Sequence, residues 1–303
     1  MKTVFLVPYG GLGNQLFQLA AALSASNGGS VNVLRYWGFA RENSNHELEI
    51  QSFRWGERIN YLYSPKLGNN SRRLLNLLLR LGAENKNRKF LVLLEFLAST
   101  YFSRRLWCLV KVQVNRGLGF SDIRGNGSKL ILGYFQSNNY VKRVVTEMQD
   151  TRLVRISSAA QILLEDIKGK KVLIIHVRRG DYLEQPFGVL DNEYYEQAMN
   201  EFKRDVFDEI WVFSDDVASA KQLLALKRLP HIKYLEGSGL SSAEIMEIMR
   251  HGSGFIIANS SFSWWSAQLK YHPEAKVVCP SPWFKYIDSP EGILDKEWLP
   301  IQW

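Results

Sequence analysis

Cysteine is scarce in this sequence, which has only two among 303 residues, Cys108 and Cys279. Both stand in apolar surroundings, and their separation matches neither a metal-binding spacing nor a disulfide framework. Chains with so little cysteine are typical of reducing compartments, where disulfides do not persist. We therefore expect a cytoplasmic protein that needs no disulfide for its fold.

Long apolar runs are also missing. The apolar run near the N-terminus, residues 3–8, is too short for a signal peptide or a membrane anchor. No low-complexity tract or internal repeat stands out in the rest of the chain. The lack of an export or anchoring segment agrees with the expected cytoplasmic location.

Acidic residues are outnumbered, with 30 Asp and Glu against 38 Lys and Arg, which gives a formal net charge of +8. This excess suits an anionic ligand such as a nucleotide, a nucleic acid or an acidic membrane surface. We exclude nucleic acid, because the arginines stand at strand ends and not in one exposed stripe with interleaved aromatic residues.

The N-terminal stretch predicts a strand, a glycine-rich turn and a helix, which is typical of a ligand-binding first βα unit. The fingerprint of a dinucleotide-binding fold is incomplete. Leu16 stands where the fingerprint needs a third glycine, and Arg35 and Tyr36 stand where it needs an acidic residue. We therefore exclude a nicotinamide or flavin cofactor.

Four residues of the turn YGGLGNQ are candidates for contact with a ligand. Gly11 and Gly13 let the backbone turn tightly and lie close to a ligand or another domain. Asn14 and Gln15 fall at the start of the helix, where their side chains can both donate and accept hydrogen bonds. An equally good interpretation makes Asn14 the N-cap of this helix.

Strands and helices alternate regularly in the second half of the chain, which predicts a parallel, doubly wound sheet. The first half shows the same alternation less regularly. We predict an α/β protein with two Rossmann-like domains, residues 1–150 and 151–303, that face each other across a cleft. Such a cleft is a common place for a ligand.

The stretch KVLIIHVRRGDY, residues 171–182, is the strongest candidate for a site. Its apolar part predicts a strand buried on both faces, and the strand ends in a cluster of charge. Along an extended chain, His176 and Arg178 point to one side and Arg179 to the other. One arginine can then bind phosphate oxygens while its neighbour pairs with Asp181. The alternative is a solvated surface pair of Arg179 and Asp181.

Two further strands of the second half end in polar motifs, FSDD and NSSFSWW. Because the carboxyl ends of parallel strands meet at one edge of a sheet, the three motifs together predict one nucleotide site. Asp215 or Asp216 can accept hydrogen bonds from the two adjacent donors of a guanine edge. One of these two aspartates is instead expected to cap the following helix.

The third motif offers groups for a phosphate and a ring. Ser260 and Ser261 stand at a helix start, where backbone N–H groups and hydroxyls gather around an anion. Phe262 can stack on a base or a sugar. The alternative is that the serines serve only as an N-cap, and the paired tryptophans are more typical of a core.

The sequence has no two aspartates two residues apart. It therefore lacks the Asp-x-Asp pair with which many nucleotide-sugar enzymes hold a divalent ion. We expect no metal ion and no cofactor, because arginine can supply the positive charge beside a diphosphate.

Residues 71–114 predict apolar helices studded with arginine and lysine, and we include residues 103–112 among them. We interpret these helices mainly as the core of the first domain. The alternative is a basic, apolar surface that makes peripheral contact with the inner face of an anionic cytoplasmic membrane.

Four motifs in this order resemble the bacterial α-1,2-fucosyltransferases of glycosyltransferase family 11, namely GGLGNQLFQ, HVRRGDY, FSDD and NSSFSWW. The resemblance extends over residues 10–265. It implies a GT-B fold, GDP-fucose as the donor, inversion at the anomeric carbon and no metal requirement. It also implies a bacterial enzyme of O-antigen or other surface-glycan biosynthesis.

The resemblance implies roles for individual residues. Arg178 matches the arginine that binds the donor diphosphate, with His176 and Arg179 beside it. Asn14 matches an asparagine at the cleft between donor and acceptor. Asp215 or Asp216 matches the carboxylate that binds guanine. The strand exit that binds phosphate is matched by Ser260, Ser261 and Phe262.

The predicted reaction is a single displacement. The 2-hydroxyl of a galactose-type residue, on a galactoside or a lipid-linked glycan, attacks the anomeric carbon of fucose as GDP leaves. Arg178 stabilises the negative charge that develops on the leaving phosphate. Two alternatives stay open: a fucosyltransferase of another linkage, and a GDP-sugar-binding glycan-assembly protein without catalysis.

Overall fold

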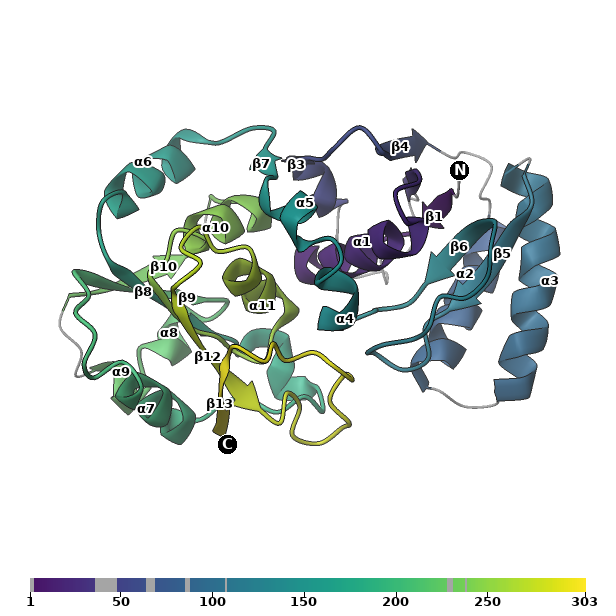
Figure 1. Cartoon of the computed structure of the whole chain (residues 1–303). Coiled ribbons are helices and arrows are strands. Elements are labelled where there is room, and N and C mark those ends of the chain that lie inside the picture. Colours follow the sequence, from purple (N-terminus) through teal and green to yellow (C-terminus); the bar gives the residue numbers. More distant parts are fainter. Residues whose placement is uncertain are drawn as a thin grey trace. The chain divides into compact units, whose positions relative to one another are not determined.

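The computed structural model describes residues 3–35, 48–63, 69–84, 88–106, 108–227, 231–237 and 239–303. Contacts divide the chain into two compact units (Figure 1). The first unit is Met1–Arg152 with Pro290–Ile293, and the second is Leu153–Ser289 with Leu294–Trp303. The segment Pro290–Ile293 is thus separated in sequence from the unit to which it belongs.

The first unit is built on a five-stranded parallel sheet of order β4-β2-β1-β6-β5. The chain adds β2 and then β4 on one side of β1, whereas β5 and β6 lie on the other side. Two short strands, β3 and β7, form a separate two-stranded sheet. The strands of this unit are β1 (Val4–Leu6), β2 (Val31–Arg35), β3 (Phe53–Arg54), β4 (Ile59–Tyr63), β5 (Val110–Val114) and β6 (Ser128–Leu132). Strand β7 (Arg152–Leu153) contains the last residue of the first unit and the first residue of the second.

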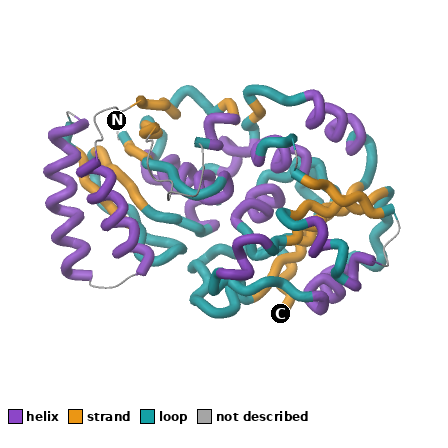
Figure 2. Tube along the Cα trace, turned by 180° about the vertical axis from the view of Figure 1, so that it is seen from behind, coloured by secondary structure: helices purple, strands orange, loops and turns teal. Residues whose placement is uncertain are grey.

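Helices pack against this sheet, and apolar residues of its strands form the core beneath them. Helix α1 contacts β1 and β2, whereas α2 and α3 pack over β5 and β6. The two long helices α2 and α3 lie side by side (Figure 2). The helices of this unit are α1 (Leu12–Ser26), the 3-10 turn η1 (Glu49–Ser52), α2 (Asn69–Glu84), α3 (Arg88–Leu106), α4 (Asn138–Val141) and α5 (Val145–Gln149).

The second unit is built on a six-stranded sheet of order β10-β9-β8-β11-β12-β13, and every pairing in it is parallel. Strand β8 is buried along its whole length, as its run of Val, Leu and Ile, interrupted only by His176, predicts. The strands are β8 (Val172–Val177), β9 (Glu209–Ser214), β10 (Ile232–Glu236), β11 (Gly254–Ile256), β12 (Lys276–Ser281) and β13 (Leu299–Gln302).

Helices α7, α8 and α9 share a core with one face of this sheet. Helix α10 packs against α6 and α11 (Figure 1). The helices of this unit are α6 (Ser158–Ile167), the 3-10 turn η2 (Gly180–Glu184), α7 (Asn192–Asn200), α8 (Val217–Ala220), α9 (Leu224–Lys227), α10 (Ser242–Met249) and α11 (Ser261–Gln268). The predicted α/β class, with a doubly wound parallel sheet in the second half, is confirmed.

One local prediction was wrong, and two strands were missed. The helix expected over residues 103–112 ends at Leu106, and Val110–Val114 forms the edge strand β5, whose valines alternate with polar residues. Strand β4 was not predicted from the sequence. Strand β13 was missed because it contains Pro300, which an edge strand tolerates.

Candidate functional site

The carboxyl ends of three neighbouring strands meet in the second unit. Strand β8 pairs with β9 on one side and with β11 on the other, all in parallel. The order in which the chain adds strands reverses between β8 and β11. In open α/β sheets, ligands bind at such a switch point, outside the carboxyl ends of the strands.

Arg178 follows β8 directly and is held by several neighbours. Its Nη2 donates to Asp181 Oδ1 at 2.6 Å, and its Nη1 lies 3.3 Å from Asp215 Oδ2. Its Cζ lies 5.3 Å from the centroid of the Tyr182 ring. The side chain is 29% exposed, and its Nε has no hydrogen-bond partner among the described residues. A guanidinium held in this way is an oriented cation with part of its surface open.

The two arginines are not paired as the sequence predicts, with one arginine on phosphate and the other on Asp181. Asp181 pairs with Arg178, the arginine expected to face a ligand. The backbone N–H of Arg179 donates to Asp215 Oδ1 at 2.9 Å, and Arg179 Nε is buried without a partner among the described residues. The Asp215 carboxylate therefore contacts both arginines, at the side chain of Arg178 and at the backbone N–H of Arg179.

Gly180 makes this arrangement possible. A Cβ atom at this position would lie 2.4 Å from Asp215 Oδ2, which is far inside van der Waals contact. The motif needs glycine here because the carboxylate approaches the backbone closely.

Asp216, next to Asp215 in sequence, has a different task. It caps helix α8, because its side chain accepts from the Ser219 backbone N–H at 2.9 Å and from the Ser219 hydroxyl at 2.5 Å. These bonds, first from the hydroxyl and then from the backbone, lower the pKa of Asp216. The expectation that one of the two aspartates caps a helix is confirmed.

His176 lies on β8 with its side chain buried. Its ring centroid is 5.9 Å from that of Phe262, and its Nδ1 has no hydrogen-bond partner among the described residues. Burial, and after it the nearby charge of Arg178, lower the pKa of His176 to about 3. The imidazole is therefore neutral near pH 7, with one nitrogen able to bond a ligand.

The third strand exit is shaped by its own hydrogen bonds. Ser260 is the N-cap of α11, and its hydroxyl accepts from the Phe262 backbone N–H at 3.4 Å. The Tyr182 hydroxyl donates to the Asn259 carbonyl at 2.9 Å and so joins this exit to the loop after β8. Trp264 and Trp265 are fully buried, which confirms that this pair belongs to the core.

A cavity of about 450 Å³ opens at this edge of the sheet. Its volume is within the range usual for small-molecule sites. Arg178, Asp215 and His176 supply polar atoms together with two serines, and Phe262 supplies a ring. The lining residues are His176, Arg178, Phe213, Ser214, Asp215, Leu235, Gly237, Leu240, Ser242, Ile245 and Phe262.

The apolar wall of this cavity was not predicted from the sequence. It consists of Leu235 on β10, with Leu240 and Ile245 before and within α10. These residues look like ordinary core positions in the sequence. Of the predicted donor residues, the lining omits five, namely Arg179, Asp181, Asp216, Ser260 and Ser261.

In the first unit, the motif GGLGNQLFQ forms the turn between β1 and α1. Gly10 has a φ of +74°, which favours glycine. Gln15 Nε2 donates to the Gly10 carbonyl at 2.8 Å, and Gln15 Oε1 accepts from the Ile50 backbone N–H at 3.2 Å. Gln15 is buried and holds the turn in place. Gly11 is the N-cap of α1, and Gly13 is buried within the helix.

Asn14 lies in the first turn of α1 and is not its N-cap, so that interpretation was wrong. Its Oδ1 accepts from Gln136 Nε2 at 2.8 Å. Gln136 follows β6, the neighbour of β1, so the pair stands at the switch point of the first sheet. Gln136 is buried, and its Oε1 has no partner among the described residues.

Gln136 was missed by the sequence analysis. The signal that identifies it is the one already used for the second half, a polar residue after an apolar strand. Gln136 follows the apolar strand β6 in the same way.

Two searches of the described part of the chain give negative results. No group of three or more His, Cys, Asp or Glu side chains there is arranged to hold a metal ion. None of the helices there is long and apolar enough to cross a membrane.

The chain is similar to known glycosyltransferases. The model of the family described as "Glycosyl transferase family 11" matches residues 92–302. An "Alpha-1,2-colitosyltransferase" of Escherichia coli is 25% identical over 296 residues, which cover 91% of this chain and 90% of that protein. The "O-antigen biosynthesis glycosyltransferase WbnK" of Escherichia coli is 39% identical over 118 residues, 36% of this chain and 38% of that protein.

Among solved structures, the glycosyl transferase family 9 protein from Veillonella parvula is similar in fold, with a TM-score of 0.50 at 10% sequence identity. The similarity covers 99% of this chain and 86% of that one. Together with the two parallel sheets, it confirms the predicted GT-B type of α/β fold.

Proposed function

Since this chain belongs to glycosyl transferase family 11, whose model matches residues 92–302, we propose that it transfers L-fucose from GDP-fucose to the 2-hydroxyl of a galactose-type residue. Glycosyltransferase activity is the property of the family. The donor sugar, the α-1,2 linkage, the inversion of configuration and the independence of metal are the proposal.

One observation carries the assignment of the donor site. Arg178 is held by Asp181 and Asp215 at the switch point of the second sheet, beside a cavity of about 450 Å³. A fixed guanidinium fork fits a diphosphate, because it can donate two parallel hydrogen bonds to phosphate oxygens. The apolar wall around Phe262 offers a surface for a base or a sugar ring.

The proposed step is a single displacement. A bond forms between the acceptor oxygen and the anomeric carbon while the bond from that carbon to the β-phosphate oxygen breaks. GDP leaves with the bonding electrons, and the proton of the acceptor hydroxyl passes to solvent. Arg178 stabilises the charge that grows on the leaving phosphate. His176, neutral at pH 7, bonds the donor through Nδ1 and does not take a proton, because a pKa of about 3 makes it too weak a base.

The acceptor side is assigned to the first unit. Asn14, held by Gln136, orients the attacking hydroxyl. Gly10 lets the turn pass close to this side chain, because an added Cβ atom would lie 2.9 Å from Asn14 Nδ2. Gln15 supports the turn from within. The similarity to an O-antigen biosynthesis glycosyltransferase supports a lipid-linked surface glycan as the acceptor.

A second donor is favoured by a specific observation. The similar protein that spans most of this chain is named as an α-1,2-colitosyltransferase. Colitose is L-fucose without its 3-hydroxyl, so GDP-colitose would present the same nucleotide and diphosphate. The linkage is the same in both candidates, and only the contact to the 3-hydroxyl distinguishes them.

The test is an assay of GDP release with GDP-fucose and GDP-colitose against a panel of galactosides, in the presence of EDTA. We expect turnover with one donor and a terminal galactoside, and an α-1,2 linkage in the product by NMR. Another linkage, a strict need for a divalent ion, or GDP binding without turnover on any acceptor would each refute part of the proposal.

A further inference from the structure

Helix α3 is apolar on both of its faces. Its inner face packs into the core of the first unit through Leu91, Ala98 and Phe102. Its outer face carries five large apolar side chains that are 46–69% exposed: Phe90, Val92, Leu93, Phe96 and Leu97. An exposed apolar patch of this kind on one helix marks an interaction surface.

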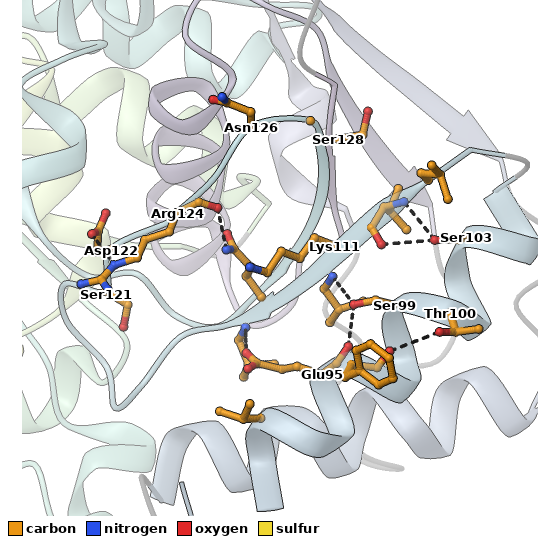
Figure 3. A pocket seen from close by; sticks show the side chains of 18 of the residues that line it. Glu95, Ser99, Thr100, Ser103, Lys111, Ser121, Asp122, Arg124, Asn126 and Ser128 are labelled. Atoms are coloured by element: carbon orange, nitrogen blue, oxygen red, sulfur yellow. Dashed lines mark hydrogen bonds and ion pairs between the residues drawn. The ribbon is translucent and has the colours of Figure 1, made fainter. Parts of the chain in front are cut away.

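A groove of about 1210 Å³ runs between α3 and the edge strand β5 (Figure 3). Val92 and Phe96 line it on the helix side, and Leu109, which is 89% exposed, lines it at the start of the strand. Lys111 and Arg124 line it as well. The exposed apolar surface therefore continues from the helix into the groove.

The strand edge in this groove is already satisfied. Glu95, Ser99 and Ser103 stand four residues apart on α3 and accept from the backbone N–H groups of β5 (Figure 3). The three donors are those of Val110, Val112 and Val114, at 2.7–3.0 Å. Because these donors are taken, an added strand from a peptide or a second copy would have no N–H row to pair with.

Positive charge in excess surrounds the apolar patch. Lys89, Arg104 and Lys111 are exposed and have no ion-pair partner among the described residues. The acidic side chains of the groove are occupied, since Glu95 pairs with Arg116. In the same way, Asp122 pairs with Arg124. A two-fold contact between two copies of this face would bring like charges together.

We propose that this outer face of α3, with the adjoining groove, docks on the surface of an anionic phospholipid bilayer. Phe96, Leu93 and Leu97 enter the boundary between headgroups and acyl chains, and Lys89 and Arg104 contact lipid phosphates. An interfacial helix of this type lies in the plane of the membrane and does not cross it. The proposal goes beyond sugar transfer and does not depend on which donor the protein uses.

The test is flotation of the full chain with vesicles of phosphatidylcholine and phosphatidylglycerol, compared with vesicles of phosphatidylcholine alone. We expect binding to the anionic vesicles that weakens as salt rises. Each basic residue near the surface is worth about fivefold in affinity. The combined change Lys89→Gln, Arg104→Gln and Lys111→Gln should therefore lower affinity about a hundredfold.

A second variant tests the apolar part of the surface. Phe96→Ser with Leu97→Ser should weaken binding about tenfold or more, because both side chains lose their burial in the membrane. The matched apolar control is Ile162→Ser, a residue 70% exposed on α6 of the second unit. The matched charge control is Arg155→Gln with Lys203→Gln and Arg204→Gln, all exposed in the second unit.

Three outcomes would overturn the proposal. The wild-type protein fails to bind anionic vesicles, or the control variants lose as much binding as the face variants. In the third, the protein does not bind vesicles, and sedimentation shows a dimer that the change Phe96→Ser dissociates. That result would assign the face to contact with a second copy of the chain. Unchanged circular dichroism and unchanged transfer to a soluble acceptor show that the variants are folded, and separate this test from that of the proposed function.

Discussion

At the scale of single residues, the proposed donor site depends on how a positive charge is held. Arg178 is fixed by two carboxylates and lies beside an aromatic ring, so its fork is oriented before any ligand arrives. Lysine has the same charge but no planar fork, and it cannot bond both carboxylates and a phosphate with fixed geometry. Charge alone would not reproduce the arrangement.

We predict that Arg178→Lys lowers kcat about a hundred- to a thousandfold, in line with the loss of one preorganised donor to a developing negative charge. GDP release from the donor with a galactoside acceptor measures it. The control is Arg155→Lys, an exposed arginine of the same unit, which should keep normal turnover. Near-normal turnover of Arg178→Lys would remove this residue from the centre of the mechanism.

His176 links the site to stability. Its pKa is about 3 in the folded protein, below the ordinary value of 6.5 that it regains on unfolding. Between these values the unfolded chain binds a proton that the folded chain does not, so acid favours unfolding. Above pH 6.5 the ring is neutral in both states and contributes no pH dependence.

We predict that the free energy of unfolding falls by about 1.4 kcal/mol per pH unit, through His176 alone, as the pH drops below 6.5 toward 3. His176→Gln keeps polar atoms at this position but cannot titrate. Urea unfolding at a series of pH values should give curves for the wild type and the variant that diverge below pH 6.5. Parallel curves would mean that the histidine is not buried as a neutral ring.

At the scale of structural elements, the exits from strands decide where chemistry can occur. The exit from β8 includes Gly180, against which Asp215 packs too closely to leave room for a side chain. The exit from β9 supplies that carboxylate, and the two exits meet only because β8 and β9 are neighbours in the sheet.

We predict that Gly180→Ala lowers the affinity for GDP about tenfold or more, because the methyl group displaces Asp215 and releases both arginines. Isothermal titration with GDP measures it. The control is Gly56→Ala, where a Cβ atom would come no nearer than 3.9 Å to another group, Glu147 Oε1. Unchanged affinity in Gly180→Ala would show that Asp215 does not set the position of the arginines.

The contact of α3 with β5 explains why a strand stands where the sequence suggested a helix. Residues 110–114 are apolar only at alternate positions, and their outward N–H groups find acceptors on α3. Pairing with β6 on the other side completes the strand. A local pattern of basic and apolar residues did not reveal these partners.

We predict that Ser99→Ala destabilises the protein by about 1–3 kcal/mol, because the buried N–H of Val112 loses its acceptor. Urea unfolding measures it. Thr100→Ala is the matched control, since its hydroxyl bonds only within the helix, to the Phe96 carbonyl, and it should change stability far less. Equal effects of the two substitutions would contradict this role of Ser99.

At the scale of the whole molecule, the two units carry different candidate sites. The proposed nucleotide-binding residues lie at the switch point of the second sheet, and Asn14 with Gln136 lies at that of the first. A ligand that binds at one site should therefore slow hydrogen exchange of the backbone amides in one unit only.

We predict that GDP at a hundredfold excess over its Kd stabilises the protein by about 2.7 kcal/mol. It should slow hydrogen exchange at residues 178–183 and 259–266 and leave residues 10–18 unchanged. Hydrogen exchange followed by mass spectrometry locates the bound GDP. Comparing samples with magnesium and with EDTA tests whether GDP binding needs a metal. Protection that appears only with magnesium, or mainly at residues 10–18, would contradict the assignment.

Much of the architecture was predictable from the sequence because local patterns encode it. The apolar run of β8, the capping aspartate of α8 and the buried tryptophans of α11 each have a physical signature within a few residues. The order of the strands has no such signature. It follows from which apolar faces pack together over long distances in the chain.

The sequence by itself determined the class of fold, the two alternating halves and the three polar strand exits, because hydrophobic period and turn chemistry are local properties. Only the tertiary structure decided which of two adjacent aspartates holds the arginines and which caps a helix. It also decided that Gln136 meets Asn14, and that α3 leaves an apolar face exposed. These outcomes depend on contacts between residues far apart in the chain, and such contacts exist only once the sheets have assembled.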